Sequence, residues 1–274
     1  MAGSEHIAYV FDTLGHGHEY VGAVQFKTDK TRYQRKIAEY IDKGIPILVI
    51  TNLNDIPAWE SDVGTYCLIV GYENSGQRIK LLVGGATIID HDLTGEIKMD
   101  MVFIWEKQRE VTLEELYIKA INKAPHWLAM PGHDGKFFGA DAYRMWADDI
   151  ESGRFEDENL ALWENYGVYV CNLATSGGEP TFIFRKLAEM NPAYTELAIL
   201  GEKIQKLLPS ETPTGGRSLL WIQLEELKGG MNMDEVKITM HDKEKRFLVA
   251  AALRNYAERL DEAVELWKEG TKKL

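Results

Sequence analysis

The sequence predicts an α+β protein, with an antiparallel sheet in residues 1–108 and an all-helical region in residues 109–274. The first observation is a pair of short apolar runs, residues 45–50 and 66–70, which are rich in Ile, Val and Leu and bounded by glycine. Runs of this length and composition are typical of buried strands. The second observation is that apolar residues recur at helical spacing in nearly every segment after Val111. This switch is the domain boundary that the sequence indicates.

The first part of the chain is expected to place a long helix ahead of a series of strands. A short helix over residues 5–15 and an extended segment over residues 20–26 come first. Residues 31–42 then carry apolar side chains on one helical face, and Gly44 follows where a helix C-cap favours a positive φ. Strands are predicted over the remaining apolar runs: residues 45–50, 66–70, 78–83, 86–92 and 101–105.

Asp90, His91 and Asp92 are adjacent in the sequence, and a carboxylate beside an imidazole suggests acid–base chemistry. Neighbouring residues on a strand face opposite sides of the sheet, so these groups would not act together on one atom. Turn residues follow on the C-terminal side. A loop without a catalytic role is therefore expected at these three residues.

The second part of the chain is expected to be built from helices alone. They are predicted over these segments: residues 111–125, 135–150, 160–173, 181–208, 218–227 and 244–268, with 181–208 interrupted at Asn191 and Pro192 and so counted as two helices. The first should stop at Pro125, because proline lacks the backbone N–H that a helix interior requires. Two Gly-Gly loops, residues 176–179 and 214–217, lack the spacing of phosphate-binding loops and are expected to be linkers.

Residues 44–47 (GIPI) and 66–73 (YCLIVGYE) carry a resemblance to a known family. A helix leading into Gly-x-Pro, then a hydrophobic strand that ends in Gly-Tyr-acid, resembles papain-like cysteine peptidase domains of the bacteriocin-processing type. It is similar also to the butirosin biosynthesis protein H-like acyltransferases. The resemblance covers residues 31–104 and implies a partial papain-like sheet domain that lacks its N-terminal segment. A shortened gene, a misplaced start codon or a trimmed polypeptide would each account for that.

The catalytic positions of that family are not filled in this chain. The catalytic His begins the second strand in the family, and Thr65 stands there in this sequence. The Asp or Asn that orients the His follows the third strand, but no carboxylate or amide appears here before Asp90. The nucleophilic Cys belongs on a helix near the N-terminus, and no Cys precedes Cys67. Because a thiol nucleophile needs a base and an orienting group, no catalytic residue is predicted.

Two functions follow from this comparison of residues. The first is a non-catalytic papain-like domain protein that binds a small ligand or another protein. The second is a cysteine-dependent acyltransferase or peptidase whose nucleophile-bearing segment is absent from this chain. The empty His and Asp positions lie inside the chain, so a missing N-terminal segment does not explain them. The sequence therefore favours the first function, without enzyme activity.

In papain-like folds the reactive cleft lies where the strand of the catalytic His begins. In this chain that edge is Thr65, and the preceding loop, residues 54–62, contains Trp59. A scaffold that loses its catalytic groups keeps the concavity, so Trp59, Thr65 and Tyr66 are predicted to border a pocket for a small molecule or a peptide. The alternative is that Trp59 only covers the edge of the sheet.

Composition excludes several classes of partner. The chain has 31 basic and 43 acidic residues, a formal net charge of −12, and no basic block that would neutralise a phosphate track. We therefore expect no nucleic-acid binding. No run approaches the roughly 18 apolar residues of a membrane span, and the N-terminus lacks the features of a signal peptide. With two cysteines, a cytoplasmic protein is expected. Nothing in the sequence specifies an oligomeric state.

His16 and His18 form a His-x-His pair, the arrangement by which two imidazoles on one strand face reach a single metal ion. A third ligand would be required, and the sequence does not identify one. A solvated turn is the expected structure, with no metal and no cofactor.

Overall fold

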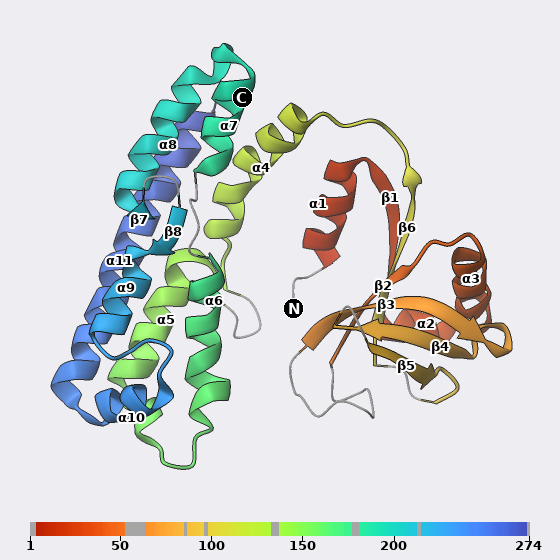
Figure 1. Ribbon diagram of the computed structural model, residues 1–274, viewed down its shortest axis with the longest axis horizontal. Coiled ribbons are helices and arrows are strands. Elements are labelled where there is room, and N and C mark those ends of the chain that lie inside the picture. The colour runs from red at the N-terminus through yellow and green to blue at the C-terminus, as the bar shows by residue number, and fades with distance from the viewer. Residues whose placement is uncertain are drawn as a thin grey trace. The chain divides into compact units, whose positions relative to one another are not determined.

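The structure is a computed structural model that describes residues 4–52, 64–84, 87–95, 98–132, 137–176, 181–212 and 215–272. It consists of two compact units, Met1–Thr112 and Leu113–Leu274 (Figure 1). An antiparallel sheet forms the centre of the first unit, and helices form most of the second. The predicted α+β class is confirmed.

The sheet of the first unit has six strands in the order β1-β6-β2-β3-β4-β5, and all neighbours are antiparallel. Their bounds are β1 (His16–Val21), β2 (Ile47–Asn52), β3 (Gly64–Glu73), β4 (Arg78–Val83), β5 (Thr87–Asp92) and β6 (Asp100–Lys107). Strands β3, β4 and β5 follow one another as neighbours, whereas β6 returns between β1 and β2. The last strand of the unit therefore lies inside the sheet and connects the edge strand β1 to β2.

Helices cover both faces of this sheet. Helix α3 (Lys30–Asp42) packs on one face, where Ile37 lies in the same apolar cluster as Val49 of β2. Helix α1 (Ser4–Leu14) packs on the other face, where Ile7 contacts the cluster of Ile50 and Val102. Successive residues of β2 thus enter different cores, as the alternation of strand side chains requires.

The sequence predicts an extended segment over residues 20–26, but only its first part is a strand. Strand β1 ends at Val21, and helix α2 (Ala23–Thr28) begins after Gly22. The Asp100 carboxylate accepts a hydrogen bond of 2.9 Å from the backbone N–H of Ala23 and so caps the helix from a distant part of the chain. Phe26 of this helix is fully buried in the core. The early helix therefore depends on a tertiary cap.

The second unit contains eight α-helices within the ranges that the structure describes. They are α4 (Leu113–Leu128), α5 (Gly139–Glu151), α6 (Val168–Ser176), α7 (Phe182–Met190), α8 (Thr195–Leu207), α9 (Leu219–Glu226), α10 (Met233–His241) and α11 (Lys243–Thr271). The long helix α11 contacts α4, α5, α8 and α9 and supplies residues to both apolar clusters of the unit. In the described part of the chain, no helix combines the length and the apolar character that a membrane crossing requires.

The sequence predicts a purely helical second unit, but the structure contains two short strands there. Strands β7 (Ser210–Thr212) and β8 (Gly215–Ser218) form a short antiparallel hairpin between α8 and α9. The Glu211 carboxylate joins the two strands by accepting hydrogen bonds from the guanidinium and the backbone N–H of Arg217. Residues 215–217 of the predicted linker belong to strand β8, and residue 214 lies outside the described residues.

Helix α4 continues through Pro125 to Leu128, whereas the sequence predicts its end at the proline. Proline cannot donate to the carbonyl group four residues earlier, which is that of Ile121. The indole N–H of Trp267 donates to this carbonyl instead. A side chain of α11 thereby allows the helix to pass the proline.

Candidate functional site

The predicted pocket residues lie only in part within the described structure. Trp59 lies outside the described residues. Thr65 and Tyr66 are consecutive residues of β3 and pair with Thr51 and Ile50 of β2. The Tyr66 side chain is 53% exposed. The pocket at this edge of the sheet thus stays a prediction.

The two cysteines occupy very different surroundings. Cys67 of β3 is 2% exposed and belongs to the apolar cluster under α3. Burial raises the pKa of the Cys67 thiol, because an apolar environment disfavours the thiolate. Cys171 lies on α6, in the other unit, and is partly exposed. A buried thiol with a raised pKa is a poor nucleophile.

His16 and His18 stand on β1, but an irregularity in the pairing with β6 falls between them. His16 Nδ1 lies 2.9 Å from the carbonyl oxygen of Trp105, and His18 Nδ1 lies 3.4 Å from the Asp12 carboxylate. His16 Nδ1 is thus within hydrogen-bond distance of a carbonyl group, whereas His18 Nδ1 lies near a carboxylate but is buried without a hydrogen-bond partner among the described residues. Among the residues that the structure describes, no group of three or more His, Cys, Asp or Glu side chains is placed to hold a metal ion.

Asp90, His91 and Asp92 lie in a strand, in agreement with the strand predicted over residues 86–92, and not in the loop that the following turn residues favoured. They form the second half of β5 and pair with β4, His91 standing opposite Ile79. Asp90 lies within ion-pair distance of Lys80, at 3.5 Å, and Asp92 accepts a hydrogen bond of 2.6 Å from the backbone N–H of Thr94. A cross-strand ion pair thus explains Asp90, and a local turn contact explains Asp92, without catalysis.

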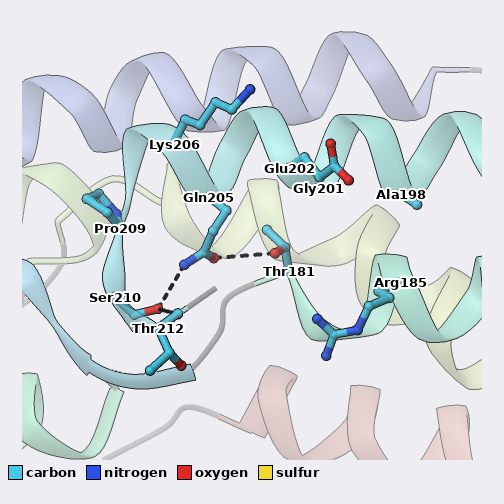
Figure 2. Close-up of a pocket in the computed structure, with 10 residues that line it drawn as sticks. All are labelled: Thr181, Arg185, Ala198, Gly201, Glu202, Gln205, Lys206, Pro209, Ser210 and Thr212. Carbon is cyan, nitrogen blue, oxygen red and sulfur yellow. Dashed lines mark hydrogen bonds between the residues drawn. The ribbon is translucent and has the colours of Figure 1, made fainter. Parts of the chain in front are cut away.

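A cavity of about 660 Å³ lies in the second unit, between α7, α8 and the start of the β7–β8 hairpin. Figure 2 shows the ten residues that line it. They are Thr181, Arg185, Ala198, Gly201, Glu202, Gln205, Lys206, Pro209, Ser210 and Thr212. All ten belong to the described part of the second unit, so the site does not depend on how the two units are arranged.

One wall of the cavity is a chain of hydrogen bonds (Figure 2). The hydroxyl of Thr181, a residue that is 4% exposed, donates to Gln205 Oε1 at 3.4 Å. Gln205 Nε2 donates to Ser210 Oγ at 2.9 Å, and the Ser210 hydroxyl donates to the carbonyl oxygen of Thr212 at 2.8 Å. Because the single proton of Ser210 is used on that carbonyl, Ser210 must accept from the Gln205 amide. The orientation of the amide follows from this constraint.

Close packing of α7 on α8 brings Thr181 within hydrogen-bond distance of Gln205. Gly201 faces α7, and a Cβ atom at that position would lie 3.0 Å from Phe184 Cβ and 3.3 Å from Thr181 Cβ. The missing side chain lets the two helices approach there. Ala198, Gly201 and Gln205 recur at helical spacing on α8, so small and polar residues line the cavity where larger apolar ones would fill it.

The charged residues of the lining are Arg185 on α7 and Glu202 and Lys206 on α8. Figure 2 shows the Arg185 guanidinium directed toward the space beside Thr181 and Thr212, while the Glu202 and Lys206 side chains point away from Gln205. The Arg185 Nε atom lies 3.7 Å from the Glu189 carboxylate. A guanidinium and a set of neutral polar groups therefore face the same space.

Sequence reasoning missed this site. The signal for it lies in the run from Ala198 to Gln205, where Ala, Gly and Gln occupy one face of an amphipathic helix. That pattern does not reveal that α7 and the hairpin close the space around the face.

Comparisons with protein families, with curated proteins and with solved structures found no match to this chain.

Proposed function

We propose that this chain is a binding protein without thiol chemistry, and that it takes a small molecule in the cavity between α7, α8 and the hairpin. The observation that carries the proposal is the cavity itself, about 660 Å³ in volume, with a hydrogen-bonded polar wall. Sites for small molecules have volumes of about 300–1,000 Å³ and combine apolar lining with a few placed polar groups. The cavity has both properties.

Within this proposal the first unit is a papain-like scaffold that does not perform catalysis. Support comes from the antiparallel neighbours β2, β3 and β4, with α3 packed against them. The buried Cys67 thiol, with its raised pKa, is unsuited to acyl transfer. The alternative, a cysteine-dependent acyltransferase or peptidase, would need a reactive thiol beside a base. A partner protein or peptide at Thr65 and Tyr66 is a separate, untested prediction.

Filling the cavity tests the proposal. Ala198→Leu adds three carbon atoms to the lining and should abolish binding of those fragments that the wild-type protein binds in a ligand-observed NMR screen. Ala251→Leu is the matched control, because Ala251 is exposed on α11 and lies outside the cavity lining. Circular dichroism of both variants checks that the helices are intact.

The proposal fails if no fragment binds the wild-type protein. It fails also if the fragments bind Ala198→Leu as tightly as they bind the wild type, because the binding site would then lie elsewhere.

A further inference from the structure

We infer that the ligand of this cavity is a hydroxylated small molecule that carries a carboxylate or phosphate group. The inference rests on the proposed function, and it assigns the acidic group to Arg185 and the hydroxyl groups to the hydrogen-bonded wall of Thr181, Gln205 and Ser210. Carboxylate and phosphate share the chemistry that matters here, since each offers negatively charged oxygens to a guanidinium.

Arg185 is suited to an anion because its planar guanidinium matches two oxygens of one acidic group at once. Figure 2 shows the guanidinium directed into the cavity space. In the rest of the lining, Glu202 and Lys206 carry opposite charges and stand one turn apart on α8. The formal charge of the lining is therefore positive, although the whole chain has a net charge of −12.

The N-terminal end of α7 gives a second and independent argument. Negative charge near a helix N-terminus is stabilising, because the helix dipole is positive at that end. The first turn of α7 contains no acidic residue, however, and the cations Arg185 and Lys186 lie near this end. Thr181 occupies the N-cap position, but its side chain makes no capping hydrogen bond and bonds instead to Gln205. Glu189 lies within ion-pair distance of both Arg185 and Lys186, but it stands near the C-terminal end of α7, away from the backbone N–H groups of the first turn. An anion bound at the N-terminal end would accept hydrogen bonds from those N–H groups, which the Thr181 side chain does not cap.

The hydrogen-bonded wall has bonding capacity left for hydroxyl groups. Gln205 Nε2 has two N–H groups, and its bond to Ser210 uses one of them. Thr181 Oγ1 and Ser210 Oγ each retain lone pairs after the bonds of the chain are made. Hydroxyl groups can both donate and accept, so they match this mixed set better than an apolar group does.

The test compares three six-carbon probes by isothermal titration calorimetry at low ionic strength: glucose, gluconate and glucose 6-phosphate. We expect at least one acidic probe to bind the wild-type protein ten-fold or more tightly than glucose does. Tighter binding of gluconate identifies a carboxylate ligand, and tighter binding of glucose 6-phosphate identifies a phosphate ligand. If glucose binds as tightly as both acids, or if neither acid binds, the inference is wrong.

Variants on α7 assign the effect to one residue. Arg185→Gln should lower the affinity for the acidic probe at least ten-fold and leave the affinity for glucose nearly unchanged. Lys186→Gln is a closely matched control, since both side chains are 38% exposed and both lie near Glu189, but Lys186 does not line the cavity. An equal loss in the two variants would indicate a general effect of charge and would overturn the role of Arg185.

Different results would overturn the proposed function and the inferred ligand class. If Ala198→Leu abolishes binding of neutral and acidic molecules alike, but the acids have no advantage in the wild type, the cavity is a binding site and the inferred ligand class is wrong. If Ala198→Leu changes nothing, the proposed function itself is wrong.

Discussion

The indole nitrogen of Trp267 donates a hydrogen bond of 2.9 Å to the carbonyl oxygen of Ile121, the residue four positions before Pro125. In an uninterrupted helix this carbonyl would accept from the backbone N–H of residue 125, which a proline lacks. Both partners of the bond are buried. A single side chain of α11 thus satisfies the group that the proline leaves without a helical donor.

We predict that Trp267→Phe destabilises the protein by about 1–3 kcal/mol, because a buried carbonyl oxygen loses its hydrogen-bond donor. Pro125→Ala should stabilise this variant more than it stabilises the wild type, since alanine restores an N–H that can reach Ile121. Urea denaturation of the wild type, both single variants and the double variant measures this difference. Additive changes, equal to within about 0.5 kcal/mol, would show that Trp267 and Pro125 are not coupled.

The thiols should react in a fixed order. In the native protein at neutral pH, we expect iodoacetamide to modify Cys171, which is partly exposed, well before the buried Cys67 with its raised pKa. Peptide mapping by mass spectrometry at successive times gives the two rates. In denaturant the two cysteines should react at similar rates, which serves as the control. Fast, selective modification of Cys67 in the native protein would contradict the absence of thiol chemistry.

The Lys36 ammonium forms an ion pair with Glu19 and lies 4.6 Å from the ring centroid of Phe103. Its side chain is 17% exposed, so the pair is shielded from water. We predict that Lys36→Met lowers the free energy of unfolding by about 1–3 kcal/mol, because Glu19 loses a charged partner. Lys43→Met, at the exposed C-cap of the same helix, should change it by less than about 0.5 kcal/mol. Similar losses in both variants would refute a specific role for the pair.

Stability should depend on Tyr20 at alkaline pH. Burial, together with the hydrogen bond to Asp100, raises the pKa of Tyr20 from 10.0 to about 12. Between these values the unfolded chain has lost the phenolic proton and the folded protein retains it, so the contribution of Tyr20 to stability falls as the pH rises from 10 to 12. The melting temperature of Tyr20→Phe should therefore fall less steeply with pH over this interval than that of the wild type. Parallel curves for the two proteins would show that Tyr20 does not titrate in this way.

Local sequence by itself determined most of the secondary structure and the class of the fold. The helical face of α3, the glycine that follows it and the apolar runs of β2 and β3 are all properties of neighbouring residues. Such patterns report which side of an element is buried, and that is sufficient to distinguish a strand from a helix. They predicted the change from a sheet to helices near Val111 as well.

Tertiary structure alone decided the remaining features, because each depends on groups that are distant in sequence. Asp100 begins α2 by capping Ala23, and Trp267 lets α4 pass Pro125. The cavity is of the same kind. Gly201 and Gln205 appear in the sequence as ordinary residues of an amphipathic helix, and they line a cavity only because α7 and the hairpin close around them. Periodicity describes one element at a time, whereas a cap, a replaced hydrogen bond or a pocket needs at least two.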